Sequence, residues 1–106
     1  METSVVYVTA STREEALNIA RALVDERLAA CANVFDRVTS VYRWQGNVEQ
    51  AGEAVMIAKT RTDLVEPLIE RVKSLHSYSC PCVVSWRIDK GNSEYLNWIA
   101  DETGSA

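Results

Sequence analysis

The sequence has 106 residues, of which 47% are hydrophobic and 25% are charged, and its formal net charge is -4. This length predicts one domain spanning residues 1–106, and the ordinary composition excludes a disordered, collagen-like or disulfide-rich chain. The acidic balance argues against a nucleic-acid backbone as partner, and no apolar run approaches the roughly 18 residues that a membrane helix needs.

The chain begins with a predicted strand and helix. Residues Ser4–Ala10 are mostly β-branched or aromatic, which is typical of a central strand. Thr12 and Glu15 have the spacing of a capping box, and apolar residues then recur at helical spacing. We therefore expect a helix from Arg13 to Leu28.

The next segment predicts a long β-hairpin. Residues Cys31–Trp44 alternate between apolar and polar side chains, Gln45–Asn47 is a turn signal, and Val48–Thr60 returns. Gly52 predicts a bulge or bend, because glycine weakens strand pairing. Such a hairpin is too long for one small domain to cover, so another surface must pair with it.

The last third predicts a second helix, a strand and a closing helix. The second helix opens at Thr60 or Thr62, with an irregular start because Pro67 sits about one turn in. A loop, a strand and a turn follow, with Asn92 or Ser93 capping a short helix. They occupy His76–Pro81, Cys82–Asp89, Lys90–Asn92 and Tyr95–Ile99. The tail Thr103–Ala106 is expected to fray.

The element order is β-α-β-β-α-β-α. Two β-α-β halves joined by a hairpin predict an α+β, ferredoxin-like split βαβ fold, with one antiparallel sheet and helices on one face.

Ser40–Gly46, which reads Ser-Val-Tyr-Arg-Trp-Gln-Gly, resembles the hairpin tip of the CutA family of divalent-cation tolerance proteins. Leu28–Val34, Lys59–Thr60 and Gly91–Ile99 resemble further family segments in the same order, so the likeness covers nearly the whole chain. It implies a tight homotrimer whose edge strands and hairpins pair around a threefold axis. It also implies binding of copper or another divalent metal ion and a role in metal tolerance.

Trimerisation also answers the problem that the hairpin poses. An exposed apolar edge that carries Tyr42 and Trp44 would aggregate unless another chain paired with it. A cyclic trimer closes such edges, and aromatic and arginine side chains are favoured at interface centres. We therefore expect Tyr42, Arg43 and Trp44 at the trimer interface.

The candidate metal ligands are His76, Cys80 and Cys82, because thiolate and imidazole suit copper and zinc. The family loop typically runs His-Pro-Tyr, two variable positions, then Pro-Glu. His76, Tyr78 and Pro81 match that pattern, whereas Ser77 and Cys82 depart from it. The alternative is that the thiols replace small apolar residues in a packed loop and that His76 caps a helix; Cys31 is expected in the core.

Other functions find less support. The sequence has a single histidine, which leaves few choices for a catalytic base, and it has no phosphate-binding loop. We therefore expect no enzyme. The third strand lacks the stacking aromatics of an RNA-binding module, which argues against nucleic acid. Two alternatives stay open: a trimeric scaffold or signalling protein, similar to PII proteins, that binds a small anion or a protein partner between subunits, and a thiol-dependent enzyme.

An odd number of cysteines leaves at least one thiol unpaired. Met1–Ser4 lack the positively charged segment of a signal peptide, and no membrane span is expected. These features predict a cytoplasmic protein with free thiols.

Overall fold

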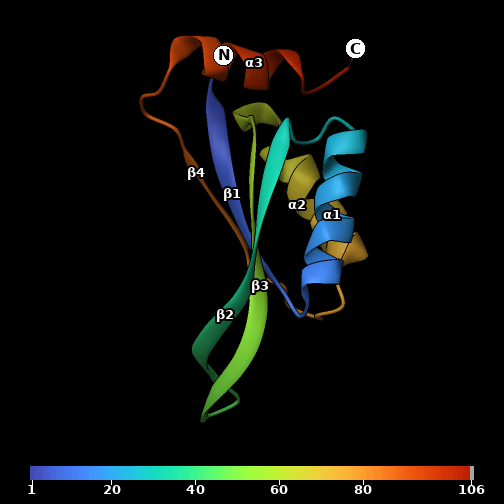
Figure 1. Cartoon of the computed structure of the whole chain (residues 1–106), viewed down its shortest axis with the longest axis vertical. Coiled ribbons are helices and arrows are strands. Elements are labelled where there is room, and N and C mark those ends of the chain that lie inside the picture. Colours follow the sequence, from blue (N-terminus) through green and yellow to red (C-terminus); the bar gives the residue numbers. More distant parts are fainter. Residues whose placement is uncertain (106) are drawn as a thin grey trace.

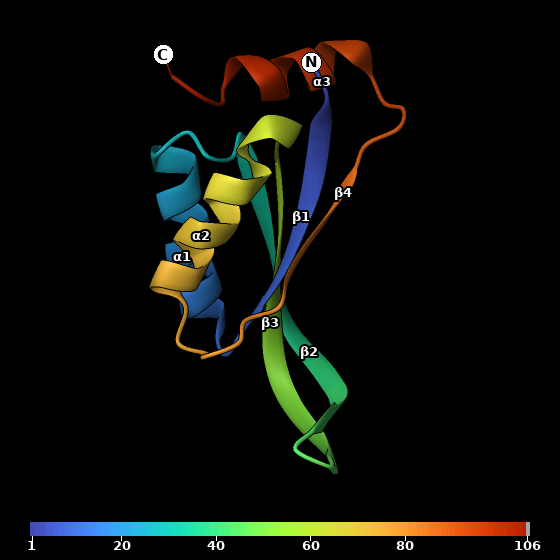
Figure 2. The same ribbon diagram turned by 180° about the vertical axis from the view of Figure 1, so that it is seen from behind.

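The computed structural model describes residues 1–105 and has the predicted order of elements, with one short 3-10 turn added. Figures 1 and 2 show the chain from opposite sides. The bounds are β1 Thr3–Ala10, α1 Arg13–Asp25, β2 Cys31–Trp44, β3 Asn47–Arg61, η1 Thr62–Leu64, α2 Val65–Leu75, β4 Val83–Arg87 and α3 Ser93–Asp101. None of the helices within residues 1–105 is long and apolar enough to cross a membrane.

The four strands form one antiparallel sheet in the order β2-β3-β1-β4. Helices α1 and α2 cover one face of this sheet, and α3 crosses its end near both termini (Figures 1 and 2). The predicted ferredoxin-like α+β arrangement is confirmed. The β2-β3 hairpin continues well beyond the helices, which makes the molecule 44 Å long but only 25 by 22 Å across (Figure 1).

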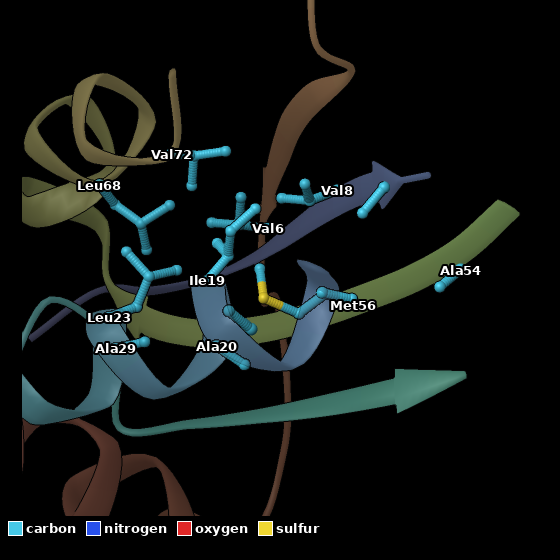
Figure 3. Packing of buried hydrophobic residues seen from close by; sticks show 13 residues of the cluster. Val6, Val8, Ile19, Ala20, Leu23, Ala29, Ala54, Met56, Leu68 and Val72 are labelled. Carbon is cyan, nitrogen blue, oxygen red and sulfur yellow. The ribbon is translucent and has the colours of Figure 1, made fainter. Parts of the chain in front are cut away.

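The core lies between the sheet and the two covering helices. Strand alternation points Val6 and Val8 of β1 and Met56 of β3 toward the helices, because Val8 pairs directly with Met56. Leu23 of α1 and Leu68 of α2 meet them from the other side, and both are fully buried (Figure 3). These side chains belong to one contiguous cluster.

Helix α1 begins as predicted but ends earlier. The Thr12 hydroxyl accepts a hydrogen bond from the Glu15 backbone N–H at 3.1 Å. The prediction that the helix runs to Leu28 is wrong, because Arg27 adopts a left-handed backbone with φ 60°. The Leu28 N–H then bonds back to the Leu23 carbonyl at 2.9 Å, which is typical of a helix C-terminus.

The predicted bulge at Gly52 is wrong. Gly52 pairs in register with Thr39, and the register shift lies instead between Phe35 and Val38. Arg37 takes a left-handed backbone there, with φ 60°, and its N–H bonds the Asp36 carboxylate at 2.7 Å. The extra residue in β2 therefore bends the hairpin where it leaves the helices.

The second half follows the predicted order with shifted bounds. The irregular start of the second helix is confirmed as η1, and Pro67 lies in the first turn of α2, where a missing N–H breaks no helical bond. Strand β4 is shorter than the predicted Cys82–Asp89. Asn92 caps α3, since its side chain accepts from the Glu94 N–H at 3.1 Å.

The C-terminal tail does not fray as predicted. Thr103 is buried and its hydroxyl donates to the Ile99 carbonyl at 2.9 Å. The Gly104 N–H donates to the Arg27 carbonyl at 2.9 Å, and Arg27 Nε returns a bond to the Gly104 carbonyl at 2.8 Å. These bonds tie the tail to the end of α1, while Ala106 lies outside the described residues.

Candidate functional site

One cleft lies between the projecting hairpin and the loop that follows α2. Its volume is about 480 Å³, within the usual range for small-molecule sites. The loop contributes Cys80 and Cys82, two of the predicted metal ligands. The lining residues are Thr9, Ser40, Tyr42, Trp44, Glu53, Tyr78, Ser79, Cys80 and Cys82.

The hairpin presents one aromatic face to this cleft. Tyr42 pairs with Glu49 and Trp44 pairs with Asn47, so the two aromatic residues share a face and Arg43 lies on the opposite face. Tyr42 and Trp44 are 43% and 48% exposed. Their placement at the trimer interface, together with Arg43, stays a prediction.

His76 anchors the loop. Its side chain is fully buried, its Nε2 lies 2.7 Å from the Thr9 carbonyl, and its Nδ1 lies 3.0 Å from the Tyr78 backbone N–H. A carbonyl can only accept and an N–H can only donate, so this pattern requires a neutral ring with its proton on Nε2. Both ring nitrogens are therefore engaged.

The three predicted ligands are only partly brought together. Cys80 and Cys82 are exposed thiols at the cleft, whereas His76 is buried behind the loop. Within residues 1–105, no group of three His, Cys, Asp or Glu side chains lies close enough to hold a metal ion. A single chain thus offers two thiols to a metal, and further ligands would have to come from another copy or from a rearranged loop.

Glu15 joins α1 to the same loop, a role that the predicted capping box did not reveal. Its carboxylate accepts bonds from the Ser11 N–H at 3.0 Å, the Ser11 hydroxyl at 2.8 Å and the Ser77 N–H at 2.8 Å. Burial opposes the charge, but these hydrogen bonds outweigh it and lower the pKa of Glu15 to about 2.

Replacing Glu15 by glutamine should therefore destabilise the protein above pH 5 by about 2 kcal/mol, because the charge-assisted bonds weaken. The carboxyl group has a lower pKa in the folded state than its ordinary 4.5, so its contribution is fully present above that value. It is lost as the pH falls toward 2. Urea unfolding from pH 7 to pH 2 checks this. The difference in the free energy of unfolding between the wild type and Glu15→Gln should shrink as the pH falls.

Glu14→Gln is the matched control, since Glu14 is exposed and occupies the same first turn of α1. It should change the free energy of unfolding by less than about 0.5 kcal/mol at any pH in this range. A difference in the free energy of unfolding between the wild type and Glu15→Gln that stays constant from pH 7 to pH 2 would contradict the stabilising role of the Glu15 carboxylate.

Glu53 is a second residue that sequence reasoning missed. The Tyr78 hydroxyl lies 2.9 Å from Glu53 Oε2, and burial together with this carboxylate raises the pKa of Tyr78 to about 12. The phenol is therefore protonated at neutral pH and donates to Glu53. The available signal was alternation, which places Glu53 on the same face of β3 as Val55 and Ile57, an otherwise apolar run.

Cys31 lies outside the cleft. It is half-buried on the open face of the sheet rather than in the predicted core, and its Sγ lies 3.4 Å from the Tyr95 hydroxyl. This hydrogen bond and burial raise the pKa of Tyr95 to about 12. Lys59 Nζ lies 5.9 Å from the Tyr95 ring centre, and Tyr95 stacks on Trp98 at 5.5 Å. The cluster holds α3 against the sheet.

Comparison with known proteins gives consistent results. The model of the CutA1 divalent ion tolerance protein family matches residues 4–102. The divalent-cation tolerance protein CutA of Thermus thermophilus is 48% identical over 100 residues, which are 94% of this chain and 97% of that protein. The chloroplastic protein CutA of Arabidopsis thaliana is 42% identical over 99 residues, and the match covers 93% of this chain but only 54% of that protein.

Solved structures extend the likeness to three dimensions. The divalent cation tolerance protein of Thermus thermophilus superposes with a TM-score of 0.94 at 47% identity, covering 96% of this chain and 99% of that one. The CutA1 structure from Oryza sativa gives a TM-score of 0.96 at 38% identity, covering 100% and 97%. At this coverage both superpositions include the long hairpin and the closing helix.

Proposed function

The chain belongs to the CutA1 divalent ion tolerance protein family, and from that membership we propose that it is a homotrimeric protein that binds copper or another divalent metal ion and contributes to metal tolerance. The observation that carries the metal proposal is the pair of exposed cysteines, Cys80 and Cys82, that line one cleft. Thiolates favour soft ions such as Cu(I), and they bind only when deprotonated.

The open face of the sheet supports the trimer. Phe35, Val84 and Trp86 are each about half exposed there, on strands that lie at the two edges of the sheet. Large apolar side chains left half exposed on edge strands are favourable places for another chain to pack, and unpaired edge strands invite pairing with another chain. A closed trimer would cover both features and would bring a second chain close to the cleft.

A second chain would also complete the metal site. One copy supplies two thiols, and copper or zinc sites commonly use three or four ligands. His76, the predicted third ligand, could take part only after giving up its bond to Thr9 or to Tyr78. A shared site between copies needs no such rearrangement.

The remaining parts of the proposal concern chemistry and compartment. We propose a binding protein rather than an enzyme, because the buried His76 ring has no free nitrogen to serve as a base for Cys80. We place it in the cytoplasm, where thiols stay reduced. Its relatives are named for different compartments, such as the chloroplastic protein of Arabidopsis thaliana and a periplasmic one of Archaeoglobus fulgidus.

The PII-like alternative, in which a small anion binds between subunits, gains less support. Among the described cleft residues the formally charged side chain is Glu53, which is acidic and would repel an anion.

Calorimetric titration of the reduced protein with Cu(I) tests the metal proposal. The wild type should bind, and Cys80→Ser/Cys82→Ser should lose at least about a hundredfold in affinity, because hydroxyls are poor ligands for soft ions. Cys31→Ser is the control and should bind as the wild type does, since Cys31 lies away from the cleft. His76→Gln tests the third ligand: weaker binding with an unchanged fold would support it.

Either of two results would remove Cys80 and Cys82 from the function. One is a wild type that takes up no copper, and the other is a double serine variant that binds copper with unchanged affinity.

A further inference from the structure

The two thiols lie on a loop that has no helix or strand of its own. It runs from His76 to Cys82, between α2 and β4. Both ends of this loop meet one residue of β1, since His76 Nε2 lies 2.7 Å from the Thr9 carbonyl and the Thr9 nitrogen lies 3.4 Å from the Cys82 carbonyl. The second distance is long for a hydrogen bond, so the loop depends on further contacts for a fixed shape.

Glu15 of α1 supplies such a contact. Its Oε2 accepts a hydrogen bond from the Ser77 backbone N–H at 2.8 Å, and the loop passes the start of α1 in both views of the chain (Figures 1 and 2). The Glu15 side chain is 15% exposed, so water competes little for its oxygens. Hydrogen bonds to a carboxylate are about twice as strong as those between neutral groups. The start of the loop is therefore held by a charged group from the helix layer.

The other oxygen of Glu15 is fixed as well. Oε1 accepts from the Ser11 N–H at 3.0 Å and from the Ser11 hydroxyl at 2.8 Å, and Ser11 lies between β1 and α1. An amide has only one acceptor oxygen, and its NH2 group cannot accept from an N–H. Glutamine at this position could therefore serve Ser11 or Ser77 but not both.

This bridge lies within one chain and on the helix side of the molecule. Glu15 belongs to α1, which covers one face of the sheet (Figure 1), whereas the apolar side chains that support the proposed trimer lie on the open face. The Ser77 N–H and the Glu15 carboxylate already satisfy each other without a second chain. Assembly through the open face therefore leaves their hydrogen bond in place.

We propose that Glu15 is a positioning residue for the metal-binding loop, although it does not touch the metal itself. Its bond to the Ser77 N–H fixes the chain three residues before Cys80, so that the thiols of Cys80 and Cys82 are held in place before a metal ion arrives. A site that is ordered in advance loses less conformational freedom on binding. The inference rests on the proposed metal function and names a residue of α1 on which that function depends.

The test measures Cu(I) affinity by competition with a Cu(I) chelator, on the assembled and reduced protein at pH 7. Glu15→Gln should weaken Cu(I) binding at least about tenfold, which is typical when a residue that orients a metal ligand is lost. The number of copper ions bound should stay the same, because both thiols remain. Glu14→Gln is the charge control and should keep the wild-type affinity, since Glu14 is exposed in the same turn of α1.

Leu23→Ala separates positioning from stability. Leu23 is fully buried in the core, so this variant is expected to lose more stability than Glu15→Gln while the bridge to Ser77 stays intact. It should bind Cu(I) with the wild-type affinity. Thermal unfolding and sedimentation confirm that each variant is folded and assembled.

Hydrogen exchange of the metal-free protein gives a second readout, in which copper plays no part. The Ser77 N–H, assigned by NMR, should exchange at least about tenfold faster in Glu15→Gln, because it loses a charged acceptor. In Leu23→Ala the Ser77 N–H should exchange as in the wild type, whereas the amides of β1 should exchange faster because the core opens more easily.

The outcomes distinguish this inference from the proposed function. A wild type that binds no Cu(I) refutes the metal function and the inference that rests on it. A wild type that binds, together with equal affinity in folded Glu15→Gln or an equal loss in Leu23→Ala, refutes the positioning role alone. An unchanged exchange rate of the Ser77 N–H in Glu15→Gln would overturn the bridge itself.

Discussion

The double variant Tyr42→Asp/Trp44→Asp is expected to sediment as single 11.8 kDa chains at micromolar concentration, whereas the wild type sediments as a particle of three chains. Tyr42 and Trp44 lie on one face of the hairpin and are nearly half exposed in the single chain. Aspartate at both positions would have to be buried without a partner in the proposed interface, which costs several kcal/mol for each subunit. Analytical ultracentrifugation over a range of concentrations measures the effect.

Asn18→Asp is the matched control. Asn18 is exposed on α1, in the helix layer on the other face of the sheet, and its substitution adds a negative charge away from the proposed interface. This variant should remain a trimer. A wild type that sediments as a single chain would refute the trimer, and a double variant that stays trimeric would refute the role of Tyr42 and Trp44 in it.

Leu23→Ala should produce a large loss of stability, as expected for a fully buried leucine in the core. Leu23 of α1 is fully buried between the sheet and Leu68 of α2, in one contiguous cluster of buried side chains (Figure 3). Removing its side chain leaves a cavity that surrounding elements can fill only in part, so we expect a loss of about 3 kcal/mol. Urea unfolding at fixed protein concentration measures it, because assembly makes stability depend on concentration.

The neighbouring residue supplies the comparison. Val24 is 39% exposed, so Val24→Ala should cost less than about 1 kcal/mol. Both residues lie next to each other in α1, so a change that acts only through the stability of the helix would affect both variants. Similar losses for both would show that the helix rather than the core determines the result.

The sequence predicts the candidate site only in part. It singles out the loop with His76, Cys80 and Cys82, and the structure places both thiols at the cleft. The chemistry of cysteine and histidine is visible in any sequence, but it does not reveal that the imidazole faces inward and bonds Thr9, a residue far away in the chain. Glu53 was missed for the same reason, since its partner Tyr78 lies on another element.

The end of α1, the C-terminal tail and the hairpin bend also differ from what the sequence predicts. Helix α1 stops where Arg27 turns to meet Gly104, and the tail is ordered by that meeting. The helical spacing of apolar residues continues through Leu28, so the sequence pattern does not indicate that the helix ends earlier. The bend at Asp36 and Arg37 replaces the one expected at Gly52, because a left-handed residue with a side-chain bond can make a bulge without glycine.

The amino-acid sequence by itself determined the order of the elements, the split βαβ topology, the capping of α1 and the family. The first three follow from spacing over neighbouring residues or from the limited ways in which such elements connect, and the family follows from the resemblance of several segments in the same order. The tertiary structure alone decided the burial of His76, the bridge from Glu15 to Ser77, and the cleft in which Tyr78 donates to Glu53. These features depend on contacts that form only when the strands are paired in register. A local sequence pattern does not identify partners that are distant in the chain.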